Sequence, residues 1–166
     1  MREKTEAELL HRMAAYCSAS ERCVQDVTKK LTPLATPEVA SRIITRLIQE
    51  SFIDEARFCR SFVNDKWKFN KWGRLKISYE LKRKNIPDEL IEEALAGIDI
   101  EAYNALLVNL MRDKRKTTKG KDAYAVSQKL YRFGLSRGFT VKEITIALKK
   151  LDAALADEAN FEDILE

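Results

Sequence analysis

Apolar residues recur every three or four positions along most of this chain, which is the period of an amphipathic helix. Residues 54–98 contain three such stretches, separated by turn residues. Asp54 is a good N-cap for the first predicted helix, Asn85 tolerates the left-handed end of the second, and Pro87 suits the first position of the third. The side chains predicted to face inward are Phe58, Cys59, Phe62 and Val63, then Ile77 and Leu81, then Leu90, Ile91, Ala94, Leu95 and Ile98.

The same pattern returns later in the chain. Sliding residues 74–98 by 53 positions brings Asn85 onto Gly138 and superposes apolar residues on apolar residues. The apolar pairs are Ile77 with Leu130, Ile86 with Phe139, Ile91 with Ile144, Ala94 with Ala147, Leu95 with Leu148, and Ile98 with Leu151. The first helix recurs at an offset of 48, so five extra residues lie within 115–126. A constant offset that preserves apolar and turn positions indicates a repeated helical unit.

A looser version of the unit comes first in the chain. Ser18 with Glu21 resembles a capping box for its second helix. Its inward positions are Leu9, Leu10 and Met13 in the first helix and Ala40, Ile43, Ile44 and Leu47 in the third. The sequence therefore predicts an all-α fold of three tandem three-helix, helix-turn-helix-like repeats in an elongated, curved array. The repeats span 1–51, 52–99 and 100–151, and residues 152–166 form an acidic C-terminal tail.

Charge is unevenly distributed along the 166 residues. The last fifteen residues contain six acids and no lysine or arginine, so the remainder carries thirty basic against twenty acidic residues. Two basic clusters stand out: Lys66, Lys68, Lys71, Arg74 and Lys76, and then Arg112, Lys114, Arg115, Lys116, Lys119 and Lys121. Solvated helix faces would explain either cluster alone. Two clusters at corresponding places in consecutive repeats favour a polyanionic or acidic partner.

Composition also bears on location and chemistry. Cys17, Cys23 and Cys59 are odd in number and lack metal-ligand spacing, which predicts reduced core thiols of an intracellular protein. The N-terminus lacks an apolar signal region and no apolar run approaches about 18 residues, so we expect a cytoplasmic protein with no membrane partner.

Candidate catalytic groups are few. His11 is the only histidine, and beside Arg12 on a helix surface it is expected to be solvated. The chain has no glycine-rich phosphate loop, nucleophile elbow or zinc-binding motif. We therefore predict no catalytic residue, no cofactor and no metal. A metal-dependent nuclease is an alternative that no motif supports.

Arg57 breaks a local rule. It stands three residues after the Asp54 cap, where the partial positive charge of a helix N-terminus disfavours a cation. We expect an ion pair with a neighbouring repeat, because capping turns anchor such packing. A contact with a binding partner is the alternative.

Cations and aromatic side chains alternate over residues 66–74. Phe69 continues the apolar spacing of the preceding helix, which predicts a core residue. Trp67 and Trp72 are candidates for stacking on bases or for contact with a protein partner. Packing at the margin of the core is the alternative for both tryptophans.

Three segments carry a resemblance to a known family: 52–63 (FIDEARFCRSFV), 72–77 (WGRLKI) and 80–86 (ELKRKNI). They resemble the central signature of the RecX regulatory proteins, and 135–139 (LSRGF) resembles the turn of that family's third repeat. The resemblance covers most of residues 5–151. Departures from the family pattern concern packing or turns: Cys59 for alanine, Ser51 and Asn85 for glycines, Lys66 for arginine and Gly134 for leucine.

The resemblance implies a non-enzymatic modulator of the RecA recombinase that lies in the groove of the RecA–DNA filament. It implies bridging of neighbouring protomers, and hence inhibition of filament extension, strand exchange and ATP hydrolysis in recombination, DNA repair and the SOS response. A monomer that binds single- and double-stranded DNA weakly and non-specifically is expected. The candidate contacts are Arg57, Lys66, Lys68, Lys71, Trp72, Arg74, Lys76, Lys82, Arg83, Arg112, Lys114, Arg115, Lys116 and Arg137.

A sequence-independent DNA-binding array without a recombinase partner is the main alternative. An elongated cationic body suits either function, because bare DNA and the RecA–DNA filament both carry phosphates that cations can bind. Salt separates them: contacts with phosphate alone predict an affinity that collapses with salt, whereas a protein partner leaves a salt-resistant component.

Overall fold

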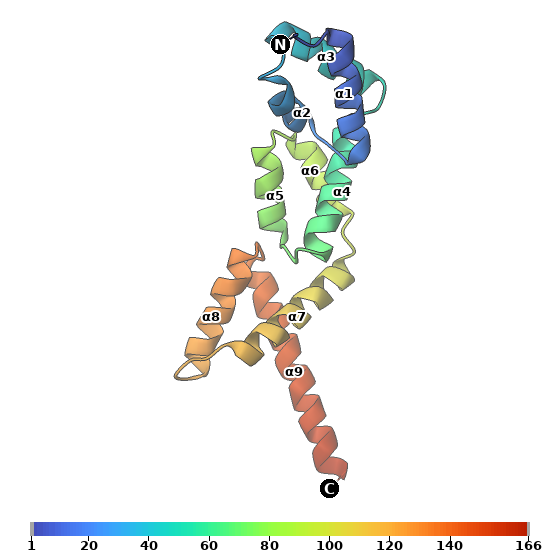
Figure 1. Cartoon of the computed structure of the whole chain (residues 1–166). Coiled ribbons are helices and arrows are strands. Elements are labelled where there is room, and N and C mark those ends of the chain that lie inside the picture. The colour runs from blue at the N-terminus through green and yellow to red at the C-terminus, as the bar shows by residue number, and fades with distance from the viewer. Residues whose placement is uncertain (1, 166) are drawn as a thin grey trace. The chain divides into compact units, whose positions relative to one another are not determined.

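The computed structural model describes residues 2–165, and over this range it contains nine α-helices and no strand (Figure 1). The helices are α1 (Glu6–Ala19), α2 (Val24–Leu31), α3 (Pro37–Gln49), α4 (Glu55–Lys68), α5 (Arg74–Arg83), α6 (Asp88–Ala96), α7 (Ile100–Thr117), α8 (Ala123–Ser136) and α9 (Val141–Leu165). They follow one another in three sets of three. The predicted all-α helical repeat fold is confirmed.

The contacts divide the chain into two compact units. The first comprises Met1–Asn64 and Tyr79–Gly97, and the second comprises Asp65–Ser78 and Ile98–Glu166. The division falls inside α4 and α5, so each of these helices contributes to both units. The repeat boundaries inferred from the sequence remain a prediction.

The first unit has a core built by α1, α2 and α3. The side chain of Thr5 accepts the N–H of Glu8, and the Glu8 carboxylate accepts the N–H of Thr5, so a capping box fixes the start of α1. The buried side chains are Leu9, Met13, Cys17, Val27, Leu31, Ile43, Leu47 and Ile53. The apolar positions predicted for the first repeat therefore pack as expected.

The predicted cap of the second helix is wrong. α1 continues through Ala19, so the hydroxyl of Ser18 lies within that helix and donates to the carbonyl of Ala14 at 2.9 Å. α2 instead follows Cys23, whose N–H donates to the Asp26 carboxylate at 3.1 Å. Ser18 and Glu21 have the spacing of a capping box, but Ser18 lies inside the preceding helix and cannot cap the next one.

Polar contacts from α2 link the first repeat to the second within this unit. Nζ of Lys84 lies 3.0 Å from Oδ1 of Asp26, and Nε2 of Gln25 donates to the carbonyl of Arg83 at 3.0 Å. Burial raises the pKa of Asp26, but hydrogen bonds from the Cys23 N–H and from Lys84 outweigh it and hold that pKa below its ordinary value. The carboxylate is therefore stabilised in its charged form at this junction.

Three buried cysteines lie in the first unit. Cys17, Cys23 and Cys59 are all free and buried. Burial raises the pKa of both Cys23 and Cys59 to about 11, so each remains a protonated thiol at neutral pH. The prediction of core thiols is confirmed.

Aromatic side chains dominate the core of the second unit. The rings of Trp67 and Tyr103 meet edge to face at 6.3 Å between centroids, and those of Tyr103 and Phe139 lie 5.4 Å apart. Trp67 is only 4% exposed, so it is a core residue. Phe69 is 79% exposed and its predicted burial is wrong, because α4 ends at Lys68 and leaves Phe69 in the following loop.

Two glycines bring distant backbone segments into contact in the second unit. The N–H of Gly73 donates to the carbonyl of Arg137 at 2.7 Å, and the N–H of Leu75 donates to the carbonyl of Gly138 at 3.0 Å. A Cβ atom on Gly73 would lie 2.3 Å from the carbonyl carbon of Gly138. The α4–α5 loop thus docks on the α8–α9 turn at a distance that leaves no room for a side chain.

Turn residues define the helix ends of the second repeat. Asn85 has φ 61°, as expected for a residue that ends a helix in the left-handed conformation, and Ser51 has φ 63°. Pro87 is predicted at the first position of the third helix, but it is the N-cap of α6, whose first residue is Asp88. The third repeat has longer helices than the second: α7 has 18 residues against 14 in α4, and α8 has 14 against 10 in α5.

The predicted acidic tail continues α9, which runs as one helix from Val141 to Leu165. No single helix in residues 2–165 is long and apolar enough to span a membrane, although α6 and α7 taken as a bent pair meet the criterion by length and composition.

Replacing Gly73 with alanine should destabilise the second unit. The added Cβ would overlap the Gly138 backbone, so we expect Gly73→Ala to lower the free energy of unfolding by about 1–3 kcal/mol. Urea unfolding followed by circular dichroism measures this change. Gly97→Ala is the matched control: its Cβ meets no atom closer than 3.4 Å, so a change below about 1 kcal/mol is expected. Equal losses in both variants would contradict the close-contact explanation.

Asp26 should make stability depend on pH. Because its pKa is lowered in the folded protein, its contribution is present above the unfolded value of about 3.9 and is lost as the pH falls through the folded pKa. Asp26→Asn should therefore be less stable at neutral pH, by about 1–3 kcal/mol, and lose less stability on acidification. Urea unfolding at several pH values measures both effects, with the exposed Asp65→Asn as control. Parallel profiles for Asp26→Asn and the parent would refute this role.

Candidate partner-binding surface

Trp72 forms the centre of a small cationic and aromatic cluster in the second unit. Nζ of Lys66 lies 4.9 Å from the centroid of the Trp72 ring, and Nζ of Lys76 lies 4.5 Å from it. Cation–π contacts at partly exposed sites contribute roughly 0.5–1 kcal/mol each. The ring and both ammonium groups are therefore preassembled by α4, the following loop and α5.

Local backbone geometry supports this cluster. α4 ends at Lys68, and Lys71 adopts the left-handed conformation with φ 57°, which turns the chain sharply before α5. The N–H of Trp72 then donates to the carbonyl of Lys66 at 3.0 Å. Lys68 and Lys71 are both exposed, so the tight loop adds two cations to the rim of the cluster.

Arg137 holds the same loop from the other side. Its Nη1 donates to the carbonyl of Asn70 at 3.1 Å, and its guanidinium lies over the ring of Phe133 at 5.4 Å. Its own carbonyl accepts the N–H of Gly73. The geometry makes Arg137 a residue that positions the loop.

Arg74 is bound within the second unit. Its backbone N–H donates to the Tyr103 hydroxyl at 3.1 Å, its guanidinium carbon lies 5.1 Å from that ring centroid, and its Nε lies 3.9 Å from Oε2 of Glu143. Burial, foremost, raises the pKa of Tyr103, so the phenol stays neutral and can accept this hydrogen bond. Arg74 therefore ties the start of α5 to α7 and α9.

Arg57 forms the ion pair predicted from its position. Its Nε lies 2.6 Å from Oε1 of Glu21, and its Nη2 donates to the carbonyl of Ser51 at 3.1 Å. Its backbone N–H donates to the Asp54 cap at 3.0 Å. Glu21 belongs to the first repeat, so the prediction of an ion pair between repeats is confirmed within the first unit.

The last turn of α5 carries two more candidates, also in the first unit. Lys82 is exposed, and Nη1 of Arg83 lies 3.5 Å from Oε1 of Glu80. The guanidinium of Arg83 lies over the ring of Tyr79 at 5.8 Å. Basic residues in the last turn also suit the negative end of the helix dipole, which is the structural explanation for both.

The second basic cluster lies at the end of α7. Nη1 of Arg112 donates to Oδ1 of Asn109 at 2.6 Å, and Nζ of Lys114 lies 4.8 Å from the Phe133 ring centroid. Nη1 of Arg115 lies 2.7 Å from Oδ1 of Asp152 in α9. Lys114 and Lys116 are exposed. The four cations share two consecutive turns of one helix.

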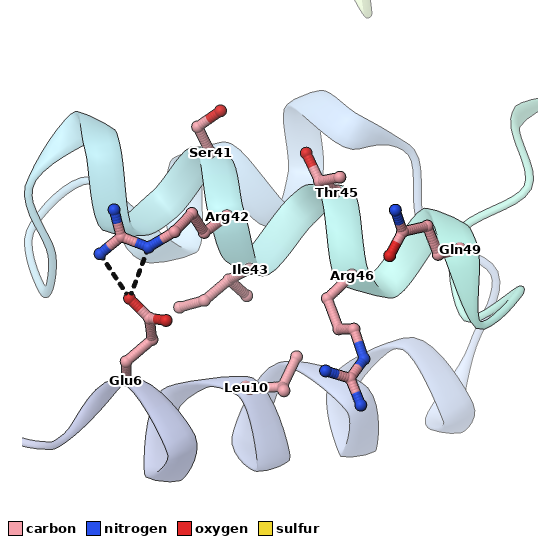
Figure 2. A pocket seen from close by; sticks show the side chains of 8 residues that line it. All are labelled: Glu6, Leu10, Ser41, Arg42, Ile43, Thr45, Arg46 and Gln49. Atoms are coloured by element: carbon pink, nitrogen blue, oxygen red, sulfur yellow. Dashed lines mark hydrogen bonds and ion pairs between the residues drawn. The ribbon is translucent and has the colours of Figure 1, made fainter.

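A surface groove elsewhere contains none of the predicted contacts. Figure 2 shows this groove of about 380 Å³ between α1 and α3. Nε and Nη2 of Arg42 donate to Oε1 of Glu6 at 3.1 and 2.7 Å, and Arg46 pairs with Glu50 at 2.8 Å. Its arginines are thus committed to carboxylates of the same unit. The other lining residues are Leu10, Ser41, Ile43, Thr45 and Gln49.

The structure thus separates the sequence candidates into two kinds. Arg57, Arg74 and Arg137 make short contacts that hold repeats and loops together. Lys66, Lys68, Lys71, Trp72 and Lys76 gather around one ring and loop, while Arg112, Lys114, Arg115 and Lys116 form the end of α7.

Sequence reasoning missed the partners that organise this surface. Tyr103 and Glu143 anchor Arg74, and Phe133 receives both Lys114 and Arg137. Tyr103 is buried in α7, and nothing in its helical spacing indicates the contact that its hydroxyl makes. Among residues 2–165, no group of three or more histidine, cysteine or acidic side chains could hold a metal ion.

Fold and surface together define a class: a helical repeat protein with preassembled cationic clusters. Residues 54–95 match the family model described as RecX, second three-helix domain. The regulatory protein RecX of Clostridium botulinum (strain Alaska E43 / Type E3) is 36% identical over 104 residues, which cover 61% of this chain and 48% of that protein. The regulatory protein RecX of Prosthecochloris aestuarii (strain DSM 271 / SK 413) is 27% identical over 91% of this chain and 98% of that protein.

A solved structure supports the fold. The crystal structure of RecX from Lactobacillus salivarius matches with a TM-score of 0.80 at 22% identity, covering 89% of this chain and 97% of that chain. The chain is therefore similar to regulatory proteins of the RecX family, over most of its length in the Prosthecochloris protein and over residues 54–95 in the family model. It spans about half the length of the Clostridium relatives that it matches.

Arg57→Ala should destabilise the first unit, because removal strands Glu21 and frees the carbonyl of Ser51. A lost buried hydrogen bond to a charge costs about 1–3 kcal/mol, and we expect the lower end because both side chains are about a third exposed. Urea unfolding measures the loss, and a double-mutant cycle with Glu21→Gln isolates the pair. Arg60→Ala, an exposed change on the same helix, is the control. A melt equal to the parent's, with partner binding lost, would instead assign Arg57 to the binding surface.

Proposed function

We propose that this protein is a non-enzymatic regulator that binds the RecA–DNA filament and limits recombinase activity in recombination and DNA repair. The observation that carries the proposal is the cluster at Trp72, where Lys66 and Lys76 lie within 5 Å of one indole ring. The similarity to proteins named regulatory protein RecX agrees with it. The cluster offers what a filament groove requires, namely cations for phosphate and an aromatic surface for protein or base.

The two kinds of candidate residue have different roles in this proposal. Lysines of the cluster and the cations at the end of α7 contact the filament, together with Lys82 and Arg83. Arg57, Arg74 and Arg137 act as positioning residues, because their guanidinium groups are occupied by contacts inside the chain. Bridging of neighbouring recombinase protomers would then restrict filament extension, strand exchange and ATP hydrolysis. The protein acts as a cytoplasmic monomer in this scheme.

Sequence-independent DNA binding without a recombinase is the second candidate function. The cations at the end of α7 favour it, because Lys114 and Lys116 are exposed and offer phosphate a basic surface on one helix. Each phosphate neutralised on single-stranded DNA adds about 0.7 to the slope of affinity against salt. A salt-resistant component of binding to RecA–DNA filaments, absent with DNA alone, supports the recombinase partner.

Reversing two exposed lysines tests the proposed surface. Lys68→Glu with Lys71→Glu should weaken inhibition of the DNA-dependent ATPase of RecA several-fold and flatten its salt dependence, because two phosphate contacts are lost. The circular-dichroism melt should stay unchanged, since both side chains are exposed. Arg12→Glu with Lys29→Glu makes the same charge change on exposed positions of the first unit and should inhibit like the parent. An ATPase that the parent leaves unchanged, alongside tight binding to bare DNA, would favour the second function.

A further inference from the structure

The face of α9 that packs on α7 changes character after Leu151. Ile144 and Leu151 are buried, and they stand seven residues apart, so they lie on one face of the helix. Glu158 follows Leu151 at the same spacing, and Glu162 follows Leu155. At these two positions the stripe that is apolar over the core carries carboxylates.

The end of α7 changes in the complementary sense. A groove of about 390 Å³ lies between the two helices in the second unit. From α7 it is lined by Arg112, Arg115 and Lys116, and from α9 by Leu151, Ala154, Leu155 and Glu158. The α7 side of the groove is thus cationic, and the α9 side is apolar apart from the Glu158 carboxylate.

One ion pair already connects the two charged segments. Nη1 of Arg115 lies 2.7 Å from Oδ1 of Asp152, and the arginine side chain is 29% exposed against 66% for the aspartate. Arg115 is therefore the more covered partner, with its guanidinium held by an acid that belongs to the same chain. This carboxylate occupies Nη1, a donor that an external phosphate would otherwise use.

We propose that the end of α9, residues 152–165, is an internal anion that competes with external polyanions for Arg112, Arg115 and Lys116. This proposal rests on the proposed function in one respect only: the proposed function identifies the natural polyanion as the DNA of the RecA filament. Asp152 and Glu158 do the shielding, because one pairs with Arg115 and the other lines the shared groove. The remaining acids of the segment raise the local negative potential without lining the groove.

Competition of this kind has a measurable consequence. Every cation released from an internal carboxylate becomes available to a phosphate, so affinity for a polyanion rises when the carboxylates are neutralised. The dependence of affinity on salt becomes steeper at the same time, by about 0.7 for each phosphate gained on a single strand. A loss of net negative charge in general raises affinity much less, since charges farther apart than about 8–10 Å are screened.

The test compares two doubly neutralised variants of the full chain. Asp152→Asn with Glu158→Gln removes the acid that pairs with Arg115 and the acid that lines the groove, whereas Asp157→Asn with Asp163→Asn removes the same charge from exposed positions of the same helix that do neither. The probes are a heparin column and a fluorescein-labelled oligothymidylate followed by anisotropy. Mass spectrometry of phenylglyoxal-treated protein reports the accessibility of Arg115 itself.

The first variant should elute from heparin at higher salt than the parent and the control, bind oligothymidylate several-fold more tightly, and react faster at Arg115. Equal gains in both variants would overturn the proposal, because the effect would then be one of net charge. An unchanged Arg115 rate, or a faster rate without tighter binding, would overturn it as well. RecA is absent from this experiment, so failure of the proposed function appears separately, in the ATPase assay.

Discussion

A backbone contact between two glycines is the constraint on which the second unit depends. The α4–α5 loop and the α8–α9 turn come so close at Gly73 and Gly138 that their hydrogen bonds run directly from main chain to main chain. A side chain at Gly73 would prevent this approach. The loop that carries Trp72 therefore takes its position from a turn of the next repeat. The candidate binding surface consequently depends on the backbone of Gly73 and Gly138, although neither residue has a side chain that could contact a partner.

Arginines and lysines divide the work around this contact. Arg57, Arg74 and Arg137 each join segments far apart in the sequence, using guanidinium groups that can meet a carboxylate, a carbonyl or a ring. Lys66 and Lys76 instead surround Trp72, where a compact and well-hydrated ammonium group can stay near water. Loss of one of these three arginines should act through the fold, and loss of Lys66 or Lys76 should act on binding. The sequence alone does not separate these two roles, because it shows only that the residues are basic.

Acidic and basic residues are also concentrated in different segments of the second unit. The chain carries a net charge of only +4, yet its last fifteen residues hold six acids and no lysine or arginine, while basic residues cluster at the end of α7 and around Trp72. Arg115 and Asp152 show the two groups in contact. The proposed competitor of a polyanion at α7 is thus already in contact with one of its cations.

The sequence by itself determined the helical class, the repeated unit, most inward positions, the Asp54 cap, the left-handed Asn85 and the resemblance to RecX. These follow from hydrophobic period and capping, which are local properties of the chain. Only the tertiary structure decided that Trp67 is buried while Phe69 is exposed, that Ser18 belongs to α1, and which groups the arginines contact. Those outcomes depend on where a helix ends and on which distant segment packs against it. No local spacing encodes such contacts, because their energy arises only when the repeats come together.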